Sequence, residues 1–353
     1  MLVKHRRDFM VGGALGALCG LSPSLLLAQR KTLPTEKPPI ELITSDTQRA
    51  IDRGLAYLAR RQIRTGNQKG AFGTGGYAGG VAVSGLSGLA FMCGGNPPGQ
   101  GLYGKNVNLC VSFILRNCRE TGYIAVSSGG HDNMYGHGFA TLFLAEVYGM
   151  SHDKEVGKKL RKAVKLISDC QNSHGGWRYQ PRKSDADLSI TICQIMGLRA
   201  ARDAGVNVSD EVREKCISYV KKSQNTDGGF RYQISGGGST FPLTAAGLVS
   251  LYSAGIYDGP EIEKGLKHLM RYLPGKGSTG SYYFYGHYYA VQAMWHAGGK
   301  YWDQWYPAIR NDLLKKQHAD GSWTDSSVGQ EFGTAMACII LQMPNNYLPI
   351  FSP

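Results

Sequence analysis

The sequence predicts an all-α protein, an α/α toroid in which six helical-hairpin repeats form a double ring of about twelve helices. Three stretches support this prediction: residues 171–177 (QNSHGGW), 224–230 (QNTDGGF) and 317–323 (QHADGSW). Each reads Gln, three residues mostly of turn-forming type, Gly, Gly or Ser, and a large aromatic residue. Each follows a helix-like segment with charge on one side and precedes an apolar segment. A Gly-rich turn therefore recurs between two helices, which is typical of an internal repeat.

Weaker copies of the turn complete the set of six. They lie at residues 70–72 (GAF), 122–123 (GY) and 280–282 (GSY). The successive turn aromatics are 51, 54, 53, 52 and 41 residues apart. A period near 50 fits two helices and a long turn. The predicted turn aromatics are Phe72, Tyr123, Trp177, Phe230, Tyr282 and Trp323.

The helices before and after each turn differ in polarity. Residues 156–167 place apolar side chains on one face and basic side chains on the other, as a solvated outer helix does. Residues 188–201 have only two long polar side chains, and residues 241–254 have no charge. A helix that is apolar nearly all round is a buried helix. We therefore expect an outer ring of amphipathic helices and an inner ring of apolar ones.

Six such units predict a closed ring whose inner helices surround a central cavity. An open solenoid is the alternative, but solenoids usually carry polar caps at both ends. The last unit instead runs apolar through residues 335–343. The aromatic-rich segment 282–306 either fills gaps between helices or gives the cavity an aromatic wall, which would suit a polyisoprenoid and could stabilise a carbocation.

The Gln-x-x-x-Gly-Gly-(Trp/Phe) turns resemble the QW-type repeats of squalene and oxidosqualene cyclases and the related repeats of protein prenyltransferase β subunits. The resemblance covers about residues 46–344 and implies a single α/α toroid. It implies less about activity, because the same fold occurs in complement thioester domains and in some carbohydrate-active enzymes. The Gly-Cys-Gly-Glu-Gln motif of the thioester domains is absent from the sequence.

Residues 1–28 resemble a twin-arginine export signal. Arg6 and Arg7 are followed by one residue, by Phe9 and by an apolar run that Gly and Pro interrupt too often for a good membrane-spanning helix. We expect export to the periplasm or cell envelope, with a Sec signal and a retained N-terminal anchor as alternatives. The Pro-containing residues 29–45 predict a linker, and residues 46–353 the toroid.

Charge and cysteine content restrict the partners. The formal net charge is +13, and much of the excess lies on the predicted outer helices. This predicts a solvated surface or attraction to an anionic membrane surface. No nucleic-acid partner is expected, because no recognisable binding module is present. The eight cysteines include no Cys-x-x-Cys pair, which predicts small core side chains rather than a zinc or redox site. The sequence makes no prediction of the oligomeric state.

Asp185 and Asp187 are the candidate catalytic residues. The stretch Asp185-Ala186-Asp187-Leu188 resembles the first half of the Asp-x-Asp-Asp acid motif of class II terpene cyclases. That resemblance implies an acid that protonates an alkene or epoxide, and such acidity depends on neighbouring groups. Leu188 stands at the fourth position of the motif, which this chain therefore lacks. The alternative interpretation is that Asp185 or Asp187 caps the following helix.

Two similar segments supply the candidate residues of the substrate cavity. Residues 134–140 (MYGHGFA) and 284–290 (FYGHYYA) each place a histidine at the start of a predicted inner helix. Protein prenyltransferase β subunits have a zinc-binding histidine in a comparable place, but their Asp-x-Cys ligand pair is absent here. A site of two His and Asp187 stays as an alternative, but no metal or cofactor is predicted. The predicted cavity residues are His137, His287, Tyr285 and Tyr135.

The first functional hypothesis is an exported toroid that holds a hydrophobic isoprenoid or triterpenoid ligand and retains class II cyclase-type acid chemistry at Asp185 and Asp187. The alternatives are a non-catalytic envelope scaffold and a carbohydrate-active enzyme. A glycosidase would need two opposed carboxylates, for which Glu146 and Asp187 are one pair. No phosphate-binding loop, dinucleotide-binding fingerprint or nucleophile elbow is found in the sequence.

Overall fold

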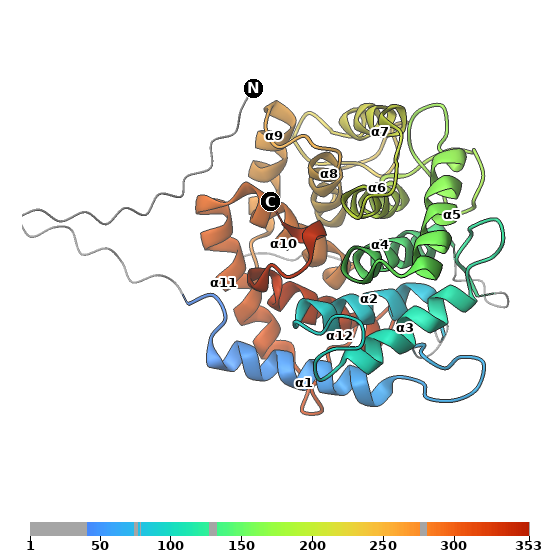
Figure 1. The fold of residues 1–353 in the computed structure, drawn as a ribbon. Coiled ribbons are helices and arrows are strands. Elements are labelled where there is room, and N and C mark those ends of the chain that lie inside the picture. Colours follow the sequence, from blue (N-terminus) through green and yellow to red (C-terminus); the bar gives the residue numbers. More distant parts are fainter. Residues whose placement is uncertain (1–40, 74–76, 78, 127–132, 276–280, 353) are drawn as a thin grey trace, which may run out of the picture. The chain divides into compact units, whose positions relative to one another are not determined.

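The computed structural model describes residues 41–73, 77, 79–126, 133–275 and 281–352. The chain divides into a unit Met1–Ile40 and a unit Glu41–Pro353. The predicted export signal and most of the predicted linker lie outside the described residues. The described part of the second unit contains twelve α-helices and, apart from isolated bridges, no strands, which confirms the all-α prediction (Figure 1). None of these described helices is long and apolar enough to cross a membrane.

The outer layer consists of the amphipathic helices. In α5, the Asp153 carboxylate accepts hydrogen bonds from two amides of the first turn, while Val156, Leu160 and Val164 are buried and the intervening Lys158 is exposed. The outer helices are α1 (Ser45–Arg61), α3 (Gly104–Arg116), α5 (Lys154–Cys170), α7 (Asp210–Lys222), α9 (Pro260–Leu269) and α11 (Gly299–Lys316).

The inner layer consists of the apolar helices, and glycine lets them approach closely. A Cβ added to Gly138 would lie 2.7 Å from Cβ of Cys193, and one added to Gly197 would lie 3.4 Å from Cβ of Thr141. The residue numbers of the contacting pairs rise together, from Gly138 with Cys193 to Thr141 with Gly197. Helices α4 and α6 therefore run in the same direction. The inner helices are α2 (Val81–Cys93), α4 (Met134–Ser151), α6 (Leu188–Asp203), α8 (Phe241–Ser253), α10 (Tyr283–Ala297) and α12 (Gln330–Leu341).

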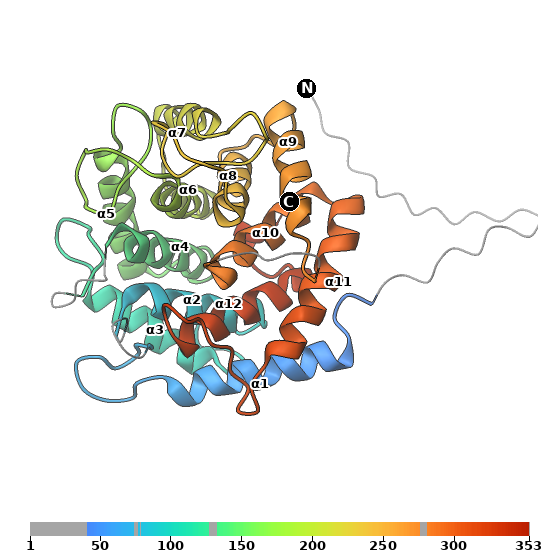
Figure 2. The same ribbon diagram turned by 180° about the vertical axis from the view of Figure 1, so that it is seen from behind.

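The inner helices form a closed ring. Each packs on the next in chain order, and the last of them, α12, packs on the first, α2. Helix α1 also packs on α11 and α12, and both ribbon views show the two ends of the repeat array side by side (Figures 1 and 2). The predicted toroid is therefore confirmed, and the open solenoid is excluded.

The glutamine that opens each turn motif joins one repeat to the next. Gln171 Nε2 donates to Gly175 O in its own turn, at 3.0 Å, and to Val212 O of α7, at 2.8 Å. Gln224 makes the same two kinds of bond in the following repeat. The side-chain amide thus fixes the turn and the neighbouring outer helix together.

The last repeat binds the first through the same contacts. Gln317 Nε2 donates to Gly321 O, at 3.0 Å, and to Ala50 O of α1, at 2.8 Å. Gly321 has φ +95°, and a Cβ there would lie 2.6 Å from Arg53 O of α1. Glycine is therefore required both for the left-handed backbone and for the close approach. The contacts between repeats therefore continue across the seam, which is the junction between the last repeat and the first.

On five of the six inner helices a polar side chain fixes the turn before the helix. Trp177 N donates to Thr191 Oγ1 at 3.2 Å, so the amide of the turn aromatic is satisfied inside the protein. In the second repeat Ile124 N donates to His137 Nδ1 at 3.1 Å, so Ile124, and not the predicted Tyr123, occupies the position of the turn aromatic. His137 therefore takes the place of a hydroxyl. The corresponding acceptors in the first, fourth and sixth repeats are Ser84, Thr244 and Thr334.

The fifth repeat departs from this pattern. Tyr282 has φ +65° and is 64% exposed, whereas the other five predicted turn aromatics are buried. The prediction that Tyr282 is a buried turn aromatic is therefore wrong. His287 is the inner-helix residue equivalent to Thr244, yet neither of its ring nitrogens has a hydrogen-bond partner in the described part of the chain.

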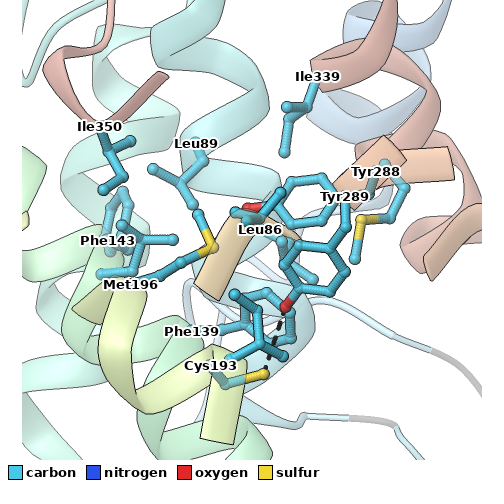
Figure 3. Close-up of a cluster of buried hydrophobic side chains, with 14 of the residues drawn as sticks. Leu86, Leu89, Phe139, Phe143, Cys193, Met196, Tyr288, Tyr289, Ile339 and Ile350 are labelled. Atoms are coloured by element: carbon cyan, nitrogen blue, oxygen red, sulfur yellow. Dashed lines mark hydrogen bonds between the residues drawn. The ribbon is translucent and has the colours of Figure 1, made fainter. Parts of the chain in front are cut away.

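Side chains occupy the middle of the inner ring, where a hollow was expected (Figure 3). Phe139 of α4 packs edge-on against Tyr288 of α10 with ring centroids 6.1 Å apart, and Cys193 Sγ of α6 lies 3.4 Å from the Tyr289 hydroxyl. Neither pair joins neighbours in the ring order, so both cross the middle. The expectation of a hollow is corrected because large aromatic side chains from opposite inner helices meet there.

A short C-terminal helix covers the end of the ring where the inner helices finish. In η4 (Pro349–Phe351), Ile350 and Phe351 are 2% and 3% exposed. Ile350 N donates to Glu146 Oε1 at 3.3 Å, and the Phe351 ring packs edge-on against Tyr288. Ile350 lies beside Phe143 and Met196 in Figure 3. The opposite end, where the inner helices begin, carries the candidate site.

Candidate functional site

Asp187 begins inner helix α6 and is fully buried. Its Oδ1 accepts a hydrogen bond from Ile190 N at 2.9 Å, which confirms that it caps the helix. The equivalent residue of the next repeat is Thr240, since Trp177 bridges to Asp187 as Phe230 bridges to Thr240. A hydroxyl is thus sufficient for the cap at this position, and the carboxylate of Asp187 is not explained by capping alone.

Two hydroxyl groups connect Asp187 to the face of the ring. Ser189 Oγ donates to Asp187 Oδ1 at 2.6 Å, and the Tyr135 hydroxyl donates to Ser189 Oγ at 2.5 Å. The Tyr285 hydroxyl donates to Ser189 O at 3.1 Å. Tyr135 and Tyr285 are both half-buried and pack edge to face with ring centroids 6.4 Å apart. A buried carboxyl group is therefore linked to side chains that solvent reaches.

Arg178 joins the two candidate aspartates. Its Nη1 lies 3.4 Å from Asp187 Oδ2 and 3.6 Å from Asp185 Oδ2. Its guanidinium lies over the rings of Tyr179 and Tyr232, at 5.1 and 5.5 Å. Asp187 Oδ2 has no hydrogen bond of normal geometry in the described structure, and Arg178 and Tyr232 both act to lower the pKa of this carboxyl. The predicted pair Asp185 and Asp187 is thus brought together around one cation.

The environments of the two aspartates differ. Burial raises the pKa of Asp187, and the hydrogen bonds from Ser189 and Ile190 and the charge of Arg178 oppose that shift. The side chain of Asp185 is 62% exposed. Two nearby carboxyl groups in unlike surroundings are suited to different roles in proton transfer. Asp187 is the one suited to hold a proton.

Tyr179, Tyr232 and Arg178 were missed from the sequence. Residues 175–180 and 228–233 both read Gly-Gly-aromatic-Arg-Tyr-Gln, so the repeat extends three residues beyond the turn aromatic. The Tyr179 and Tyr232 hydroxyls lie 2.6 Å apart. Extending the alignment of the two repeats would have found them. We refer to four half-buried tyrosines, two on inner helices and two in the segments that follow the turns, as the tyrosine cluster: Tyr135, Tyr179, Tyr232 and Tyr285.

The two histidines that were predicted to line the cavity make no hydrogen bond or ring contact with the tyrosine cluster in the described structure. His137 is fully buried against Tyr123, and burial lowers its pKa to about 4. His287 packs against Phe241 and Tyr283, with ring centroids 4.8 and 4.5 Å apart, and burial lowers its pKa to about 3. Both are neutral at neutral pH; His137 accepts the hydrogen bond from Ile124 N, and His287 packs against aromatic rings. Of the predicted cavity residues, only Tyr135 and Tyr285 come together.

The geometry gives no support to a site of two His and one Asp. His137 fixes the second turn, Asp187 caps α6, and His287 lies between α8 and α10. Over the part of the chain that the structure describes, no group of three or more His, Cys, Asp or Glu side chains could hold a metal ion.

Glu146 and Asp187 are too far apart for a glycosidase pair. Gly138 of α4 lies level with Cys193 of α6, and the two helices run in the same direction. Glu146 follows Gly138 by eight residues, while Asp187 precedes Cys193 by six. At 1.5 Å per residue the two carboxyl groups are roughly 20 Å apart along the ring axis, beyond the ~5–10 Å that glycoside hydrolysis uses.

Comparisons with known proteins agree on the fold. The family profile described as the prenyltransferase alpha-alpha toroid domain matches residues 101–280. No curated protein matches the sequence. Among solved structures, the type II terpene cyclase MstE from Scytonema, without ligand, is 14% identical with a TM-score of 0.61; the match covers 86% of this chain and 100% of the cyclase.

Two other similar structures carry different activities. Cellobiose 2-epimerase from Spirochaeta thermophila is 13% identical with a TM-score of 0.63, over 86% of this chain and 98% of the epimerase. An inactive variant of an α-1,6-mannanase of Salegentibacter sp. HEL1_6, in complex with α-1,6-mannotriose, is 8% identical with a TM-score of 0.62, over 84% of this chain and 98% of the mannanase. Likeness at this level of identity shows the toroid alone, and the activity must be argued from the site.

Proposed function

Because the chain belongs to the prenyltransferase alpha-alpha toroid domain family, we propose that it binds an isoprenoid at the tyrosine cluster, with Asp187 as the proton donor of a class II cyclase-type reaction. One observation supports this most strongly. The buried carboxyl of Asp187 is linked by two short hydrogen bonds, through Ser189, to the half-buried Tyr135. Tyrosine faces suit an apolar ligand and a developing cation.

Proton transfer uses the same hydrogen-bonded chain. In the resting arrangement Tyr135 donates to Ser189 and Ser189 donates to Asp187, so both hydroxyls must first rotate. The proton of Asp187 then passes to Ser189 Oγ, the proton of Ser189 passes to the Tyr135 oxygen, and the Tyr135 proton goes to an alkene carbon of the ligand. The alkene π-bond breaks, a C–H bond forms, and both hydroxyls end as they began. Asp187 is left as a carboxylate 3.4 Å from Arg178, which stabilises the charge. The carbocation faces the tyrosine rings.

Asp187→Thr tests the proton donor without removing the helix cap. Thr240 caps the next inner helix through its hydroxyl, so the substituted protein should fold with nearly unchanged melting temperature. We expect turnover of geranylgeraniol to products of alkene protonation, cyclic or hydrated, followed by gas chromatography and mass spectrometry, to fall by about 100-fold or more. Asp153→Thr, at the exposed cap of α5, is the matched control and should keep its activity. Unchanged turnover in Asp187→Thr would overturn the assignment.

A carbohydrate-active enzyme is the second candidate. Asp185 Oδ2 and Asp187 Oδ2 lie within 3.6 and 3.4 Å of the same Arg178 nitrogen, so they are no more than about 7 Å apart, a separation that glycoside hydrolysis can use. The mannanase and the epimerase share the fold. Hydrolysis or epimerisation of a gluco- or manno-oligosaccharide that Asp185→Asn abolishes would favour this function over isoprenoid binding.

Export of the protein to the periplasm or cell envelope is also part of the proposal. It is based on the paired Arg6 and Arg7 before a Gly-rich apolar run. Exposed basic side chains such as Lys158 of α5 would then favour contact with an anionic membrane surface. Fractionation of cells that express the tagged chain, with and without Arg6→Lys and Arg7→Lys, tests the export.

A further inference from the structure

We propose that the tyrosine cluster accepts only the terminal isoprene unit of a ligand, and that the rest of the chain of such a ligand stays outside the ring. This inference rests on the proposed function and narrows its substrate class. A linear prenyl chain presented end-on fits it, whereas a triterpenoid enclosed within the ring does not. Three features of the inner ring support the inference: the depth of the cluster, the packing below it, and the closure of the opposite end.

Side chains become fully buried one helical turn below the cluster. Tyr285 belongs to the tyrosine cluster and is half-buried, while Tyr289, four residues later on the same face of α10, is fully buried. The two rings pack edge to face with centroids 4.9 Å apart. At 1.5 Å per residue the step between them is about 6 Å. That is close to the length of a single isoprene unit.

A layer of buried side chains forms the floor below the cluster. Tyr289 of α10 reaches across the ring, where its hydroxyl lies 3.4 Å from Cys193 Sγ of α6. Phe139 of α4 packs against the neighbouring Tyr288. The repeats place these side chains at matching positions, two residues after His287, Thr191 and His137. We call this set the floor layer: Leu86, Phe139, Cys193 and Tyr289, each at most 4% exposed.

Entry from the opposite end is closed as well. Below the floor layer, Phe143 and Met196 pack with Leu89 in the middle of the ring (Figure 3). Ile350 of η4 lies beside them, and its amide is held by Glu146. A ligand that reaches Tyr135 therefore meets packed side chains one helical turn further into the ring. The proton from Asp187 can then go only to the terminal isoprene unit of that ligand.

A chain-length series of prenyl alcohols tests this directly. Titration calorimetry would compare prenol, geraniol, farnesol and geranylgeraniol, which grow by one isoprene unit each. We expect affinity to stop rising early, with less than about threefold gain beyond geraniol. A ligand enclosed along its length would gain more than about tenfold for each unit, because each unit buries several carbons. Such a steady rise would overturn this inference and leave the proposed function intact, whereas no binding of any alcohol would overturn the proposed function.

Shortening a side chain of the floor layer should raise by one isoprene unit the ligand length at which affinity stops rising. In Tyr289→Ala we expect farnesol to bind more than about tenfold tighter than geraniol, because the lost ring leaves room for a second unit. Tyr252→Ala is the matched control: it removes another fully buried tyrosine, on α8, and should keep the wild-type plateau. A Tyr289→Ala protein that folds and keeps the plateau contradicts the floor. If Tyr289→Ala does not fold, the wild-type series decides alone.

Discussion

Glu146→Gln should remove a pH dependence of stability worth about 5 kcal/mol. Burial raises the pKa of Glu146 from its ordinary 4.5 to about 8, although the hydrogen bond from Ile350 N opposes the shift. The folded protein therefore holds this proton more tightly than the unfolded chain. The stabilisation is fully present below pH 4.5 and is lost as the pH rises to about 8.

Urea unfolding between pH 5 and 9 measures this effect. The wild type should lose stability steadily over that range because an unpaired charge forms beside η4. Gln at position 146 keeps an oxygen for the Ile350 amide and has no proton to lose, so its stability should change far less. Glu120, which is exposed beside Lys162 and whose pKa is lowered, provides the control as Glu120→Gln. Parallel pH curves for wild type and Glu146→Gln would contradict the burial of this acid at the closed end.

Trp323→Ala should cost about 3–5 kcal/mol of the free energy of unfolding. Trp323 is fully buried, and its indole Nε1 donates to Leu313 O at 2.9 Å. Its ring also lies so close to α1 that a Cβ added to Gly54 would come within 2.9 Å of it. The indole therefore fills the seam between the sixth repeat and the first.

Trp177→Ala is the matched substitution inside the array. Trp177 is 1% exposed, and its Nε1 donates to Ile167 O at 2.7 Å. In a closed ring the seam is equivalent to any other junction, so the two losses should agree within about 1 kcal/mol. In an open solenoid the last repeat frays, and its tryptophan would cost much less. Chemical unfolding of both variants distinguishes these two outcomes.

The fold could be predicted because the contacts between repeats depend on residues that lie close together in the sequence, within each turn motif. The Gln, the left-handed Gly and the aromatic each have a contact that recurs in every well-formed repeat, so their spacing gave the number of hairpins. The fifth repeat was misjudged because Tyr282 follows the pattern in sequence only. Its left-handed backbone turns the side chain outward, which spacing cannot show.

The site could be predicted only in part. Asp187, Tyr135 and Tyr285 were found because they lie at the starts of inner helices, where side chains of different repeats meet. The path through Ser189 depends on rotamers, and a single serine carries no pattern. His137 was misleading because histidine suggests chemistry, while here it replaces the threonine that fixes a turn. The filled centre depends on side-chain size at opposite helices, which periodicity does not report.

Photoaffinity labelling tests the central claim, that the tyrosine cluster is the ligand site, most directly. The probe is farnesol with a diazirine on its terminal isoprene unit, and the labelled peptides are located by mass spectrometry. The account predicts labels on peptides that contain Tyr135, Tyr179, Tyr232 or Tyr285, and competition by unmodified farnesol. Labels confined to the η4 end of the ring, or to the outer helices, would contradict it.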